Sequence, residues 1–382
     1  MAIDHEVGCM NTRHSIPSHT QQALFLALFA TVGCATKSNS SSPIEAGDTG
    51  VLTEQHSTAV VTTVAGDYST GSFATVAIDT LNVRDELFIT SGDPVVRADE
   101  GHIFQINRLG YDHVRLYTPG QWLEPVWEQG VGDNSNPHDA NVCGGQLYIS
   151  LYDRDYIAVH DVDLGILVGT VDLSPFNDGD EQSPEASRFV EIEGRLYAGL
   201  NRLNRNNDWK SEGGVVVEID CDTQEVARHW EVGDSTQVYP WPGQNRLLVA
   251  SNANDTESAL LLTIDLESGD TTTLIDTGNQ NIVGMAAKDD RAIGISVAED
   301  YSHYAIHCFD LNTGTWSTIE ETDSFLTGVY ANDNGDAWIT AGRPWIDLEA
   351  PSGIFVYDIE TCTSKEDEPI LFSLYPYSMA FY

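Results

Sequence analysis

The chain has 382 residues, enough for a large core, and carries 59 acidic against 18 basic residues, a formal net charge of -41. The acidic residues are scattered along the sequence, which is typical of a solvated acidic surface and not of an acidic tail. Because binding to phosphates requires a basic surface, nucleic acid is strongly disfavoured as a partner.

The first 33 residues are predicted to be a targeting segment. Ala23–Gly33 is an apolar run of signal-peptide length and is too short to span a bilayer. It ends in Thr31-Val32-Gly33-Cys34, which resembles a bacterial lipoprotein signal box with Cys34 as the lipidated residue. A soluble secreted protein is the alternative. We therefore expect an exported protein, lipid-anchored to the outer membrane or cell surface, with residues 34–56 as a flexible tether.

The stretch from Asn136 to Ser174 has the clearest structural pattern. Val, Ile and Tyr alternate with polar residues in four short runs joined by tight turns, which is typical of an antiparallel meander. We interpret this unit as one blade of a β-propeller. Its expected strands are Asp139–Cys143, Gln146–Leu151, Tyr156–Asp161 and Leu167–Leu173.

The same pattern recurs along residues 57–382. The spacing of about 40 to 60 residues between units suits a blade-type repeat. The most regular marker is an aspartate that closes the third strand, at Asp79, Asp161, Asp220, Asp265, Asp310 and Asp358, with Thr118 in the equivalent place. Second strands are expected at Ile103–Ile106, Leu147–Ser150, Leu196–Gly199, Leu247–Ala250, Ala292–Ile295 and Ala337–Thr340.

Counting the units predicts an all-β fold, a seven-bladed β-propeller of four-stranded antiparallel blades over residues 57–382. Residues 58–91 hold three strands without a first one, whereas Tyr375–Tyr382 looks like a first strand. Joined, the two segments make a seventh blade, so that the carboxyl-terminal strand closes the ring and covers its sheet edges. The complete blades are expected at 93–131, 136–174, 183–232, 235–277, 281–319 and 325–373.

The chain resembles the YVTN-type β-propeller repeat proteins, especially bacterial surface lipoproteins of that class. The resemblance extends loosely over residues 58–382. Its motifs are specific for the fold and weak for function, because the family spans binding, scaffolding and unassigned proteins. The residues that carry it are Asn136-Pro137-His138-Asp139, Gln146–Ser150, and Ser183-Pro184-Glu185 with Gly194–Leu203.

Loops between blades, and those from second to third strands, share one face of a propeller around its funnel. Arginine is scarce in this chain, yet several arginines fall in these loops. A pocket formed by these arginines in an acidic protein would suit a carboxylate, a phosphate or a glycan acid. The alternative is that the arginines pair with Asp153, Asp178 or Glu185 and hold long loops in place. The candidate ligand-binding residues are Asn107, Arg108, His138, Asp139, Arg154, Glu185, Asn201, Arg202 and Arg205.

Two further sites deserve a hypothesis. Asp178, Asp180 and Glu181 lie in one loop, and oxygen-rich loops suit Ca²⁺, although the spacing of an EF-hand is missing. An acidic loop without a bound ion is the alternative. His138 beside Asp139 has the composition of a base and its orienting carboxylate, but a structural cap that bonds loop backbone is the alternative.

The cysteines after Cys34 are expected to be unpaired. Cys221 and Cys362 are expected near outer hairpins of blades far apart on the ring, beyond disulfide reach. No pair is evident among these two, Cys143 and Cys308, and none has metal-ligand spacing. We therefore interpret all four as small apolar residues.

These patterns favour a non-enzymatic module without a resident cofactor. Its propeller would bind a protein partner or an anionic ligand at the funnel face, and the protein would contact the membrane only through its lipid anchor. The first alternative is a Ca²⁺-assisted hydrolase or lactonase-like propeller that uses Glu185 with a metal-bound water. The second is a purely architectural envelope protein. No G-x-S-x-G elbow, H-E-x-x-H motif or P-loop occurs.

Overall fold

The computed structural model describes residues 56–177, 182–205, 210–253, 258–298, 303–344 and 349–382. The chain divides into two units, residues 1–53 and 54–382, and all of the described structure belongs to the second. The expected targeting segment, the tether and Cys34 therefore lie outside the described residues. Within those residues, no helix is long and apolar enough to cross a membrane.

The described strands form five four-stranded antiparallel sheets, one seven-stranded sheet and one two-stranded sheet. The first sheet has the order β29(Tyr375–Phe381), β1(Thr58–Val64), β2(Gly71–Ala77) and β3(Val83–Thr90). The second has β4(Pro94–Asp99), β5(His102–Asn107), β6(His113–Tyr117) and β7(Trp127–Gly130). The third has β8(Pro137–Cys143), β9(Gln146–Leu151), β10(Tyr156–Asp161) and β11(Leu167–Asp172).

The other two four-stranded sheets come from the carboxyl-terminal part of the chain. One has β21(Gln280–Lys288), β22(Arg291–Ala298), β23(Tyr304–Asp310) and β24(Thr315–Thr322). The next has β25(Leu326–Ala331), β26(Asp336–Ala341), β27(Gly353–Asp358) and β28(Thr363–Ser364). A short 3-10 helix, η1(Ser174–Phe176), follows β11.

The seven-stranded sheet is organised around one long strand, β17(Glu225–Pro240). The first half of β17 pairs with β16(Gly214–Asp220), and its second half pairs with β18(Arg246–Asn252). The sequence predicts two separate blades here, but the chain continues from one to the other without a turn. The remaining strands are β12(Ala186–Ile192), β13(Arg195–Leu200), β19(Ala259–Asp265) and β20(Thr271–Gly278), while β14(Leu203–Asn204) and β15(Lys210–Ser211) form the two-stranded sheet.

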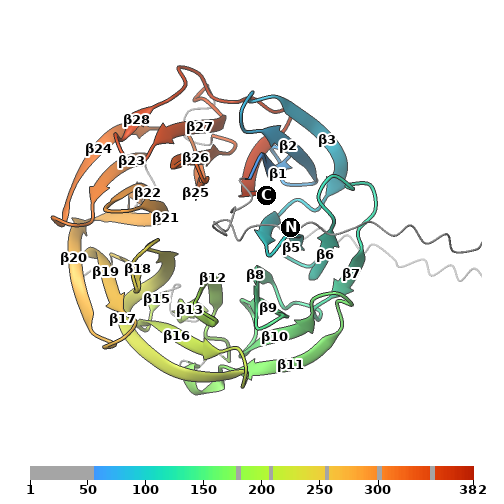
Figure 1. Cartoon of the computed structure of the whole chain (residues 1–382), viewed down its shortest axis with the longest axis vertical. Helices are drawn as coiled ribbons and strands as arrows, with labels where there is room; N and C mark the ends of the chain where they lie inside the picture. Colours follow the sequence, from blue (N-terminus) through green and yellow to red (C-terminus); the bar gives the residue numbers. More distant parts are fainter. Residues whose placement is uncertain (1–55, 178–181, 206–209, 254–257, 299–302, 345–348) are drawn as a thin grey trace, which may run out of the picture. The chain divides into compact units, whose positions relative to one another are not determined.

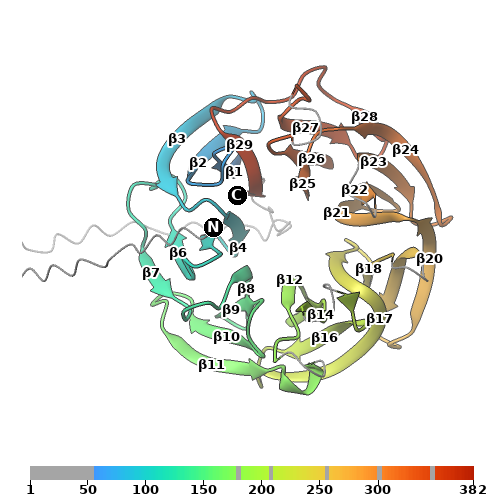
Figure 2. The ribbon, with the colours of Figure 1, turned by 180° about the vertical axis from the view of Figure 1, so that it is seen from behind.

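The sheets stand radially about a central axis, as Figures 1 and 2 show. Strands β8, β12, β21 and β25 lie nearest this axis, and β3, β11, β24 and β28 lie at the outer rim (Figure 1). The two ends of the described chain meet in the first sheet, where Met379 of β29 lies opposite Val61 of β1. The backbone N–H of Thr58 also donates to the carbonyl of Tyr382 at 3.2 Å.

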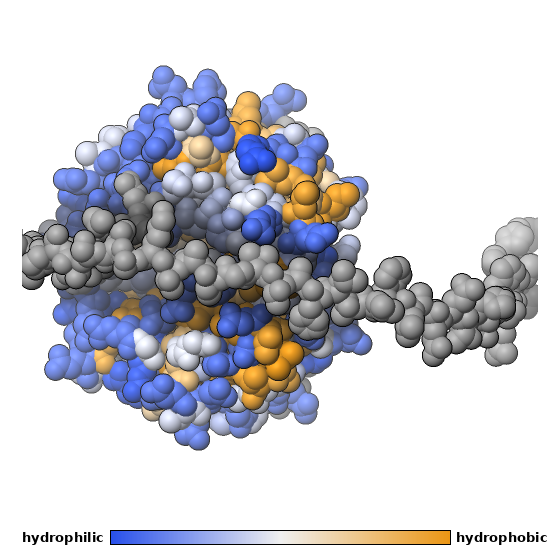
Figure 3. Space-filling model, turned by 45° about the vertical axis from the view of Figure 1, so that its right-hand side comes forward, coloured by the Kyte–Doolittle hydropathy of each residue, from blue (hydrophilic) through white to orange (hydrophobic). Residues whose placement is uncertain are grey.

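The hydrophobic core lies between neighbouring sheets. Tyr148 and Ile157 of one sheet, for example, pack in one cluster with Leu196 and Val217 of the next. Inner strands such as β13 and β22 are buried on both faces, whereas outer strands such as β11 are largely exposed. Each fully buried large apolar side chain stabilises the fold by about 1.5–3 kcal/mol. The outer surface seen in Figure 3 is mainly hydrophilic, with hydrophobic residues in separate patches.

Aspartates close third strands because their side chains fix the turn that follows. Oδ1 of Asp220 accepts hydrogen bonds from the N–H groups of Asp222 and Thr223, both at 3.0 Å. These backbone donors lower the pKa of Asp220. The marker at Asp79 is an exception, because β2 already ends at Ala77 and Asp79 lies in the turn.

The predicted strands agree closely with the structure. β9 and β10 have the predicted bounds, β8 begins two residues before the predicted strand, and β11 ends one residue earlier. The predicted second strands all lie within β5, β9, β13, β18, β22 and β26.

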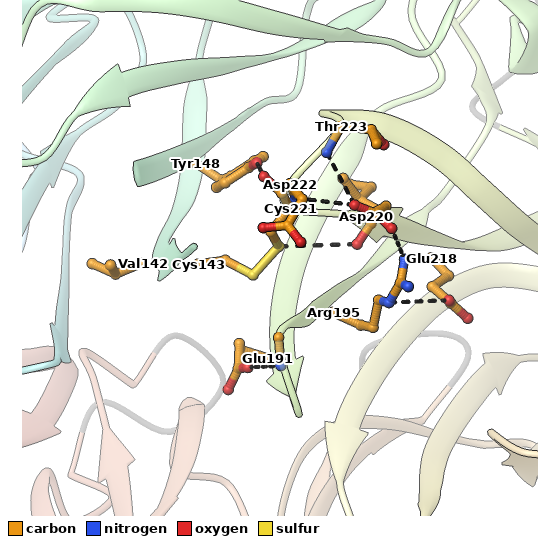
Figure 4. Close-up of a disulfide and its surroundings, with 12 residues drawn as sticks. Val142, Cys143, Tyr148, Glu191, Arg195, Glu218, Asp220, Cys221, Asp222 and Thr223 are labelled. Carbon is orange, nitrogen blue, oxygen red and sulfur yellow. Dashed lines mark hydrogen bonds and ion pairs between the residues drawn. A yellow bond between two sulfur atoms is a disulfide. The ribbon is translucent and has the colours of Figure 1, made fainter. Parts of the chain in front are cut away.

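The prediction of four unpaired cysteines is wrong. Cys143 is bonded to Cys221 and Cys308 to Cys362, with Cα atoms 5.8 Å and 5.7 Å apart. Cys143 ends β8 and Cys221 lies in the turn after β16, so this disulfide joins two neighbouring sheets (Figure 4). Cys221 and Cys362 are indeed not paired with each other; each is bonded to a cysteine of the adjoining sheet. Strand patterns fix pairing within a sheet but not the register between sheets.

Candidate functional site

A cavity of about 390 Å³, here called the central cavity, is lined by strands from every large sheet. Its lining includes residues of β4, β8, β12, β17, β21, β25 and β29. Each of these strands is the one nearest the axis in its sheet, and the seven-stranded sheet contributes two of them, β12 and β17. A volume of this size is within the range of small-molecule sites. The cavity therefore sits where side chains from all these strands converge.

Irregular strand pairing turns side chains toward the central cavity. An extra residue on one strand of an antiparallel pair forms a β-bulge, which interrupts the ladder and re-aims a side chain. Six of the strands nearest the axis carry such an irregularity. In β17 the extra residue is Ser235, which is not among the lining residues, whereas in the other five the side chain lines the cavity. These residues are Tyr377 in β29, His138 in β8, Ser187 and Arg188 in β12, Val283 in β21 and Thr327 in β25.

The central cavity is basic although the protein is strongly acidic. Arg97, Arg108 and Arg188 line it together with His138, and no aspartate or glutamate is among the described lining residues. Fixed positive charge in a concave, partly desolvated site attracts anions more strongly than the same charge on an open surface. The arrangement therefore favours an anionic occupant.

Two of these arginines have acidic partners behind them. Arg97 pairs through Nε with Asp139, whose side chain is 3% exposed. Arg108 pairs with Asp93 and also donates from Nη2 to the hydroxyl of Tyr377 at 2.8 Å. Burial raises the pKa of Tyr377, so its hydroxyl stays neutral at physiological pH. Both guanidinium charges are thus largely compensated within the protein.

Arg188 differs from both. Its guanidinium lies over the ring of Tyr239, with Cζ 5.0 Å from the ring centroid. Within the part of the chain that the structure describes, this guanidinium has no hydrogen bond and no ion pair. The side chain is half-buried and lines the central cavity. A partly desolvated cation without a counter-ion gains most from a bound anion.

Over the residues that the structure describes, His138 lacks the hydrogen bonds that a base oriented by Asp139 or a backbone cap would make. Its ring stacks on Tyr152, with centroids 4.2 Å apart and an interplanar angle of 16°. Among the described residues, His138 bonds neither Asp139 nor loop backbone. Burial and the nearby charge of Arg108 hold the pKa of His138 well below its usual value, so the imidazole is neutral at pH 7.

Asp139 and Asn107 serve as structural connectors. Asp139 accepts from the N–H of Phe189 at 2.8 Å and from Arg97, which links β8 to β12 and to β4. Oδ1 of Asn107 accepts from the N–H of Ser91 at 3.3 Å. Asp139 therefore positions Arg97 at the cavity, while Asn107 holds the loop before β4. A direct ligand contact by either residue remains a prediction.

The remaining predicted ligand-binding residues form a separate group, here called the loop cluster: Arg154, Glu185, Asn201, Arg202 and Arg205. Glu185 is fully buried, with a backbone φ of 57°, and its Oε2 accepts from the N–H of Leu203. Nη2 of Arg205 lies 3.6 Å from Oε1 of Glu185. Arg205 also pairs with Asp153.

The other members of the loop cluster are bonded to loop backbone or to a neighbouring side chain. Arg202 donates from Nη1 to the carbonyl of Gly213 at 3.0 Å, and Arg154 donates from Nη2 to the carbonyl of Asp133 at 2.6 Å. Nδ2 of Asn201 lies 3.5 Å from the hydroxyl of Tyr152. These contacts match the alternative in which arginines hold long loops in place. Binding of a ligand by the loop cluster remains a prediction.

The proposed calcium ligands Asp178, Asp180 and Glu181 lie outside the described residues. Within the described part of the chain, no group of three or more His, Cys, Asp or Glu side chains could hold a metal ion. The calcium site therefore remains a prediction from the sequence.

Sequence reasoning missed the two cavity arginines that lie within strands. Arg97 and Arg188 are on β4 and β12, whereas the search for a site considered only loops. These arginines could have been predicted as site residues, because each lies on an expected first strand and the first strand of a blade is the one nearest the axis. Of the nine predicted ligand-binding residues, Arg108 and His138 line the central cavity.

Comparison with known proteins identifies the fold and nothing finer. No family model matches the chain, and no curated protein matches it. A solved protein from Lactobacillus plantarum is similar over 86% of this chain and 99% of its own, with a TM-score of 0.62 and 12% identity. The β-propeller domain of Cps50 (Swd1) from Myceliophteria thermophila is similar over 82% and 100%, with a TM-score of 0.56 and 12% identity.

A third structure, apo AztD from Citrobacter koseri, is similar over 86% of this chain and 98% of its own, with a TM-score of 0.50 and 10% identity. The fold is that of a β-propeller. Identities this low are informative about fold alone, so the YVTN repeat type stays a prediction.

Proposed function

We propose that this β-propeller is a binding module that holds a small anion in its central cavity. The observation that carries the proposal is Arg188, a half-buried guanidinium in the cavity without an acidic partner among the described residues. The cavity volume suits a small molecule better than a glycan chain or a protein loop. Charge-assisted bonds from guanidinium to carboxylate or sulfate are about twice as strong as neutral ones.

The proposal is tested by isothermal titration of the folded protein with sodium acetate and sodium sulfate at constant ionic strength. We expect binding to the wild type and a loss of at least about tenfold in Arg188→Gln, which corresponds to about 1.4 kcal/mol. Arg291→Gln is the matched control, because Arg291 pairs with Asp310 and does not line the cavity. Equal affinity in the wild type and Arg188→Gln would refute the proposal.

The hydrolase alternative has less support. Glu185 is the carboxylate on which it depends, and that side chain is fully buried against Leu203 and Arg205. It is absent from the described lining of the central cavity. A water activated at Glu185 would therefore have no access to a ligand in that cavity.

We further propose that the protein is exported and lipid-anchored through Cys34, on the outer membrane or cell surface. Two disulfides between neighbouring sheets support export, because disulfides persist mainly in oxidising compartments. Incorporation of labelled palmitate into the wild type, but not into Cys34→Ala, is the expected result. Equal labelling of both proteins would contradict the anchor.

We also propose that the ring has seven four-stranded blades. Two observations support this count. β17 supplies an outer strand to one half of the seven-stranded sheet and an inner strand to the other, and β29 pairs with β1. Deletion of residues 375–382 should then abolish cooperative unfolding, whereas a truncated protein that unfolds like the wild type would exclude closure by this strand.

A further inference from the structure

A second cavity of about 350 Å³ adjoins the central cavity. The two share Arg108, Phe325 and Tyr377 as lining residues. Tyr377 lies at the boundary, with the guanidinium of Arg108 5.8 Å from its ring centroid and Tyr68 packed edge-on at 6.3 Å. A ligand whose charged group lies among the arginines can therefore extend a second group across this shared wall.

The second cavity has a mainly aromatic and apolar lining, to which the paired Arg108 and Asp93 also contribute. Four rings, those of Tyr68, Tyr111, Phe325 and Tyr377, surround it together with Leu109. At its rim, Leu109 is 67% exposed, Tyr111 54% and Tyr68 43%. Exposed apolar side chains gathered around a cavity are typical of a binding site, all the more in a chain with a net charge of -41.

The backbone of this rim is held in an unfavourable conformation. Tyr68 has a φ of 56° and Leu109 a φ of 48°, a region that bulky residues rarely adopt and that costs about 1 kcal/mol or more. Neighbouring loops keep the rim in place. A Cβ atom at Gly92 would lie 1.7 Å from the carbonyl oxygen of Tyr68, so the two segments approach as closely as a glycine allows. Strain of this kind persists where the surroundings impose it, often at binding sites.

We infer that the ligand is a small aromatic carboxylate, with its carboxylate at Arg188 in the central cavity and its ring in the second cavity. This inference rests on the proposed function, because it needs an anion in the central cavity. Edge and face contacts with four protein rings favour an aromatic over an aliphatic group. The two volumes suit a small molecule, so a peptide with a carboxyl-terminal aromatic residue is the competing occupant.

The test compares phenylacetate, cyclohexylacetate and acetate by isothermal titration. We expect phenylacetate to bind the wild type at least about tenfold more tightly than acetate, a difference of about 1.4 kcal/mol, and more tightly than cyclohexylacetate. Asparagine adopts positive φ more readily than Tyr or Leu, so a Tyr68→Asn, Leu109→Asn double variant should keep or gain stability. In this variant the preference for phenylacetate over acetate should fall at least severalfold, because one ring and Leu109 are lost from the second cavity.

Glu193→Asn is the matched control, since Glu193 has a φ of 52° and lines neither cavity. A wild type that binds acetate through Arg188 but shows no preference for phenylacetate overturns this inference and leaves the proposed function intact. If none of the three acids binds the wild type more tightly than Arg188→Gln, both this inference and the proposed function are overturned. Much tighter binding of a peptide ending in phenylalanine than of phenylacetate overturns the small-molecule assignment.

Discussion

The loop cluster and the central cavity both contain arginines, but the two regions use them differently. In the loop cluster, Arg154, Arg202 and Arg205 bond to nearby carbonyls or carboxylates. In the central cavity, Arg188 lies over an aromatic ring and has no acidic partner among the described residues. A guanidinium that already has partners contributes to loop stability, whereas one without them remains available to a ligand.

The difference follows from the elements that carry these residues. Loops of an acidic chain place carboxylates and carbonyls within reach of any arginine they contain. Strands near the axis instead present single side chains to a concave space, and here no described lining side chain is acidic. We therefore expect substitutions in the loop cluster to change stability, and substitutions in the cavity to change anion affinity.

The largest effect is expected from Glu185→Ala. Removing a fully buried carboxylate deprives the N–H of Leu203 of its acceptor and Arg205 of one of its carboxylates, which should cost about 3 kcal/mol of unfolding free energy. Denaturant unfolding measures this loss. Sulfate affinity, measured by titration, should be unchanged. A parallel loss of affinity would show that the loop cluster also contributes to anion binding.

Asp139→Asn should affect both stability and binding. It removes the negative charge behind Arg97, so we expect a loss of about 2 kcal/mol in stability. Sulfate should bind more tightly, because a second cavity arginine then lacks its counter-charge. Asp220→Asn is the control, since Asp220 pairs with Arg195, which does not line the cavity. Weaker sulfate binding by Asp139→Asn than by this control would count against the cavity as an anion site.

Arg202→Ala should have a smaller effect. Arg202 donates to the carbonyl of Gly213 and lies 3.8 Å from the exposed carboxylate of Glu231, so we expect a loss of about 1 kcal/mol. Its sulfate affinity should equal that of the wild type. A drop in affinity with unchanged melting would instead assign ligand binding to the loop cluster.

The smallest expected effect is a pH dependence of binding through His138. Burial and Arg108 hold the pKa of His138 well below its usual value. A sulfate ion would offset the charge of Arg108 and raise that pKa, so binding takes up protons and the affinity rises as pH falls. Between pH 7.5 and pH 5, the sulfate affinity of the wild type should rise more than that of His138→Asn. An equal rise in both proteins would show that the protonation of His138 is not coupled to anion binding.

Much of the fold could be predicted because it is encoded locally. Alternation over short runs located β9 and β10, and aspartates that fix their own turns marked the ends of third strands such as β16. The disulfide between Cys143 and Cys221 could not be predicted in the same way, because it depends on how two neighbouring sheets are placed against each other.

The candidate site was only partly predictable for a related reason. Arg108 and His138 were found because they stand at the ends of expected strands, next to loops. Arg188 was missed because a bulge in β12, invisible in the alternation of its residues, turns it toward the cavity. Whether an arginine has a partner also depends on distant residues, as Arg97 and Asp139 show.

The bulged residues have an implication for how such a protein diversifies. Each one stands outside the regular ladder and lines the central cavity, so a change of its side chain leaves the ladder hydrogen bonds of the strand in place. Exchanging a bulged residue for a charged or metal-binding one would therefore alter selectivity while the strand ladder is kept. The strand ladders thus stay constant while the bulged positions vary, so a few substitutions at these positions are enough to change which ligand binds.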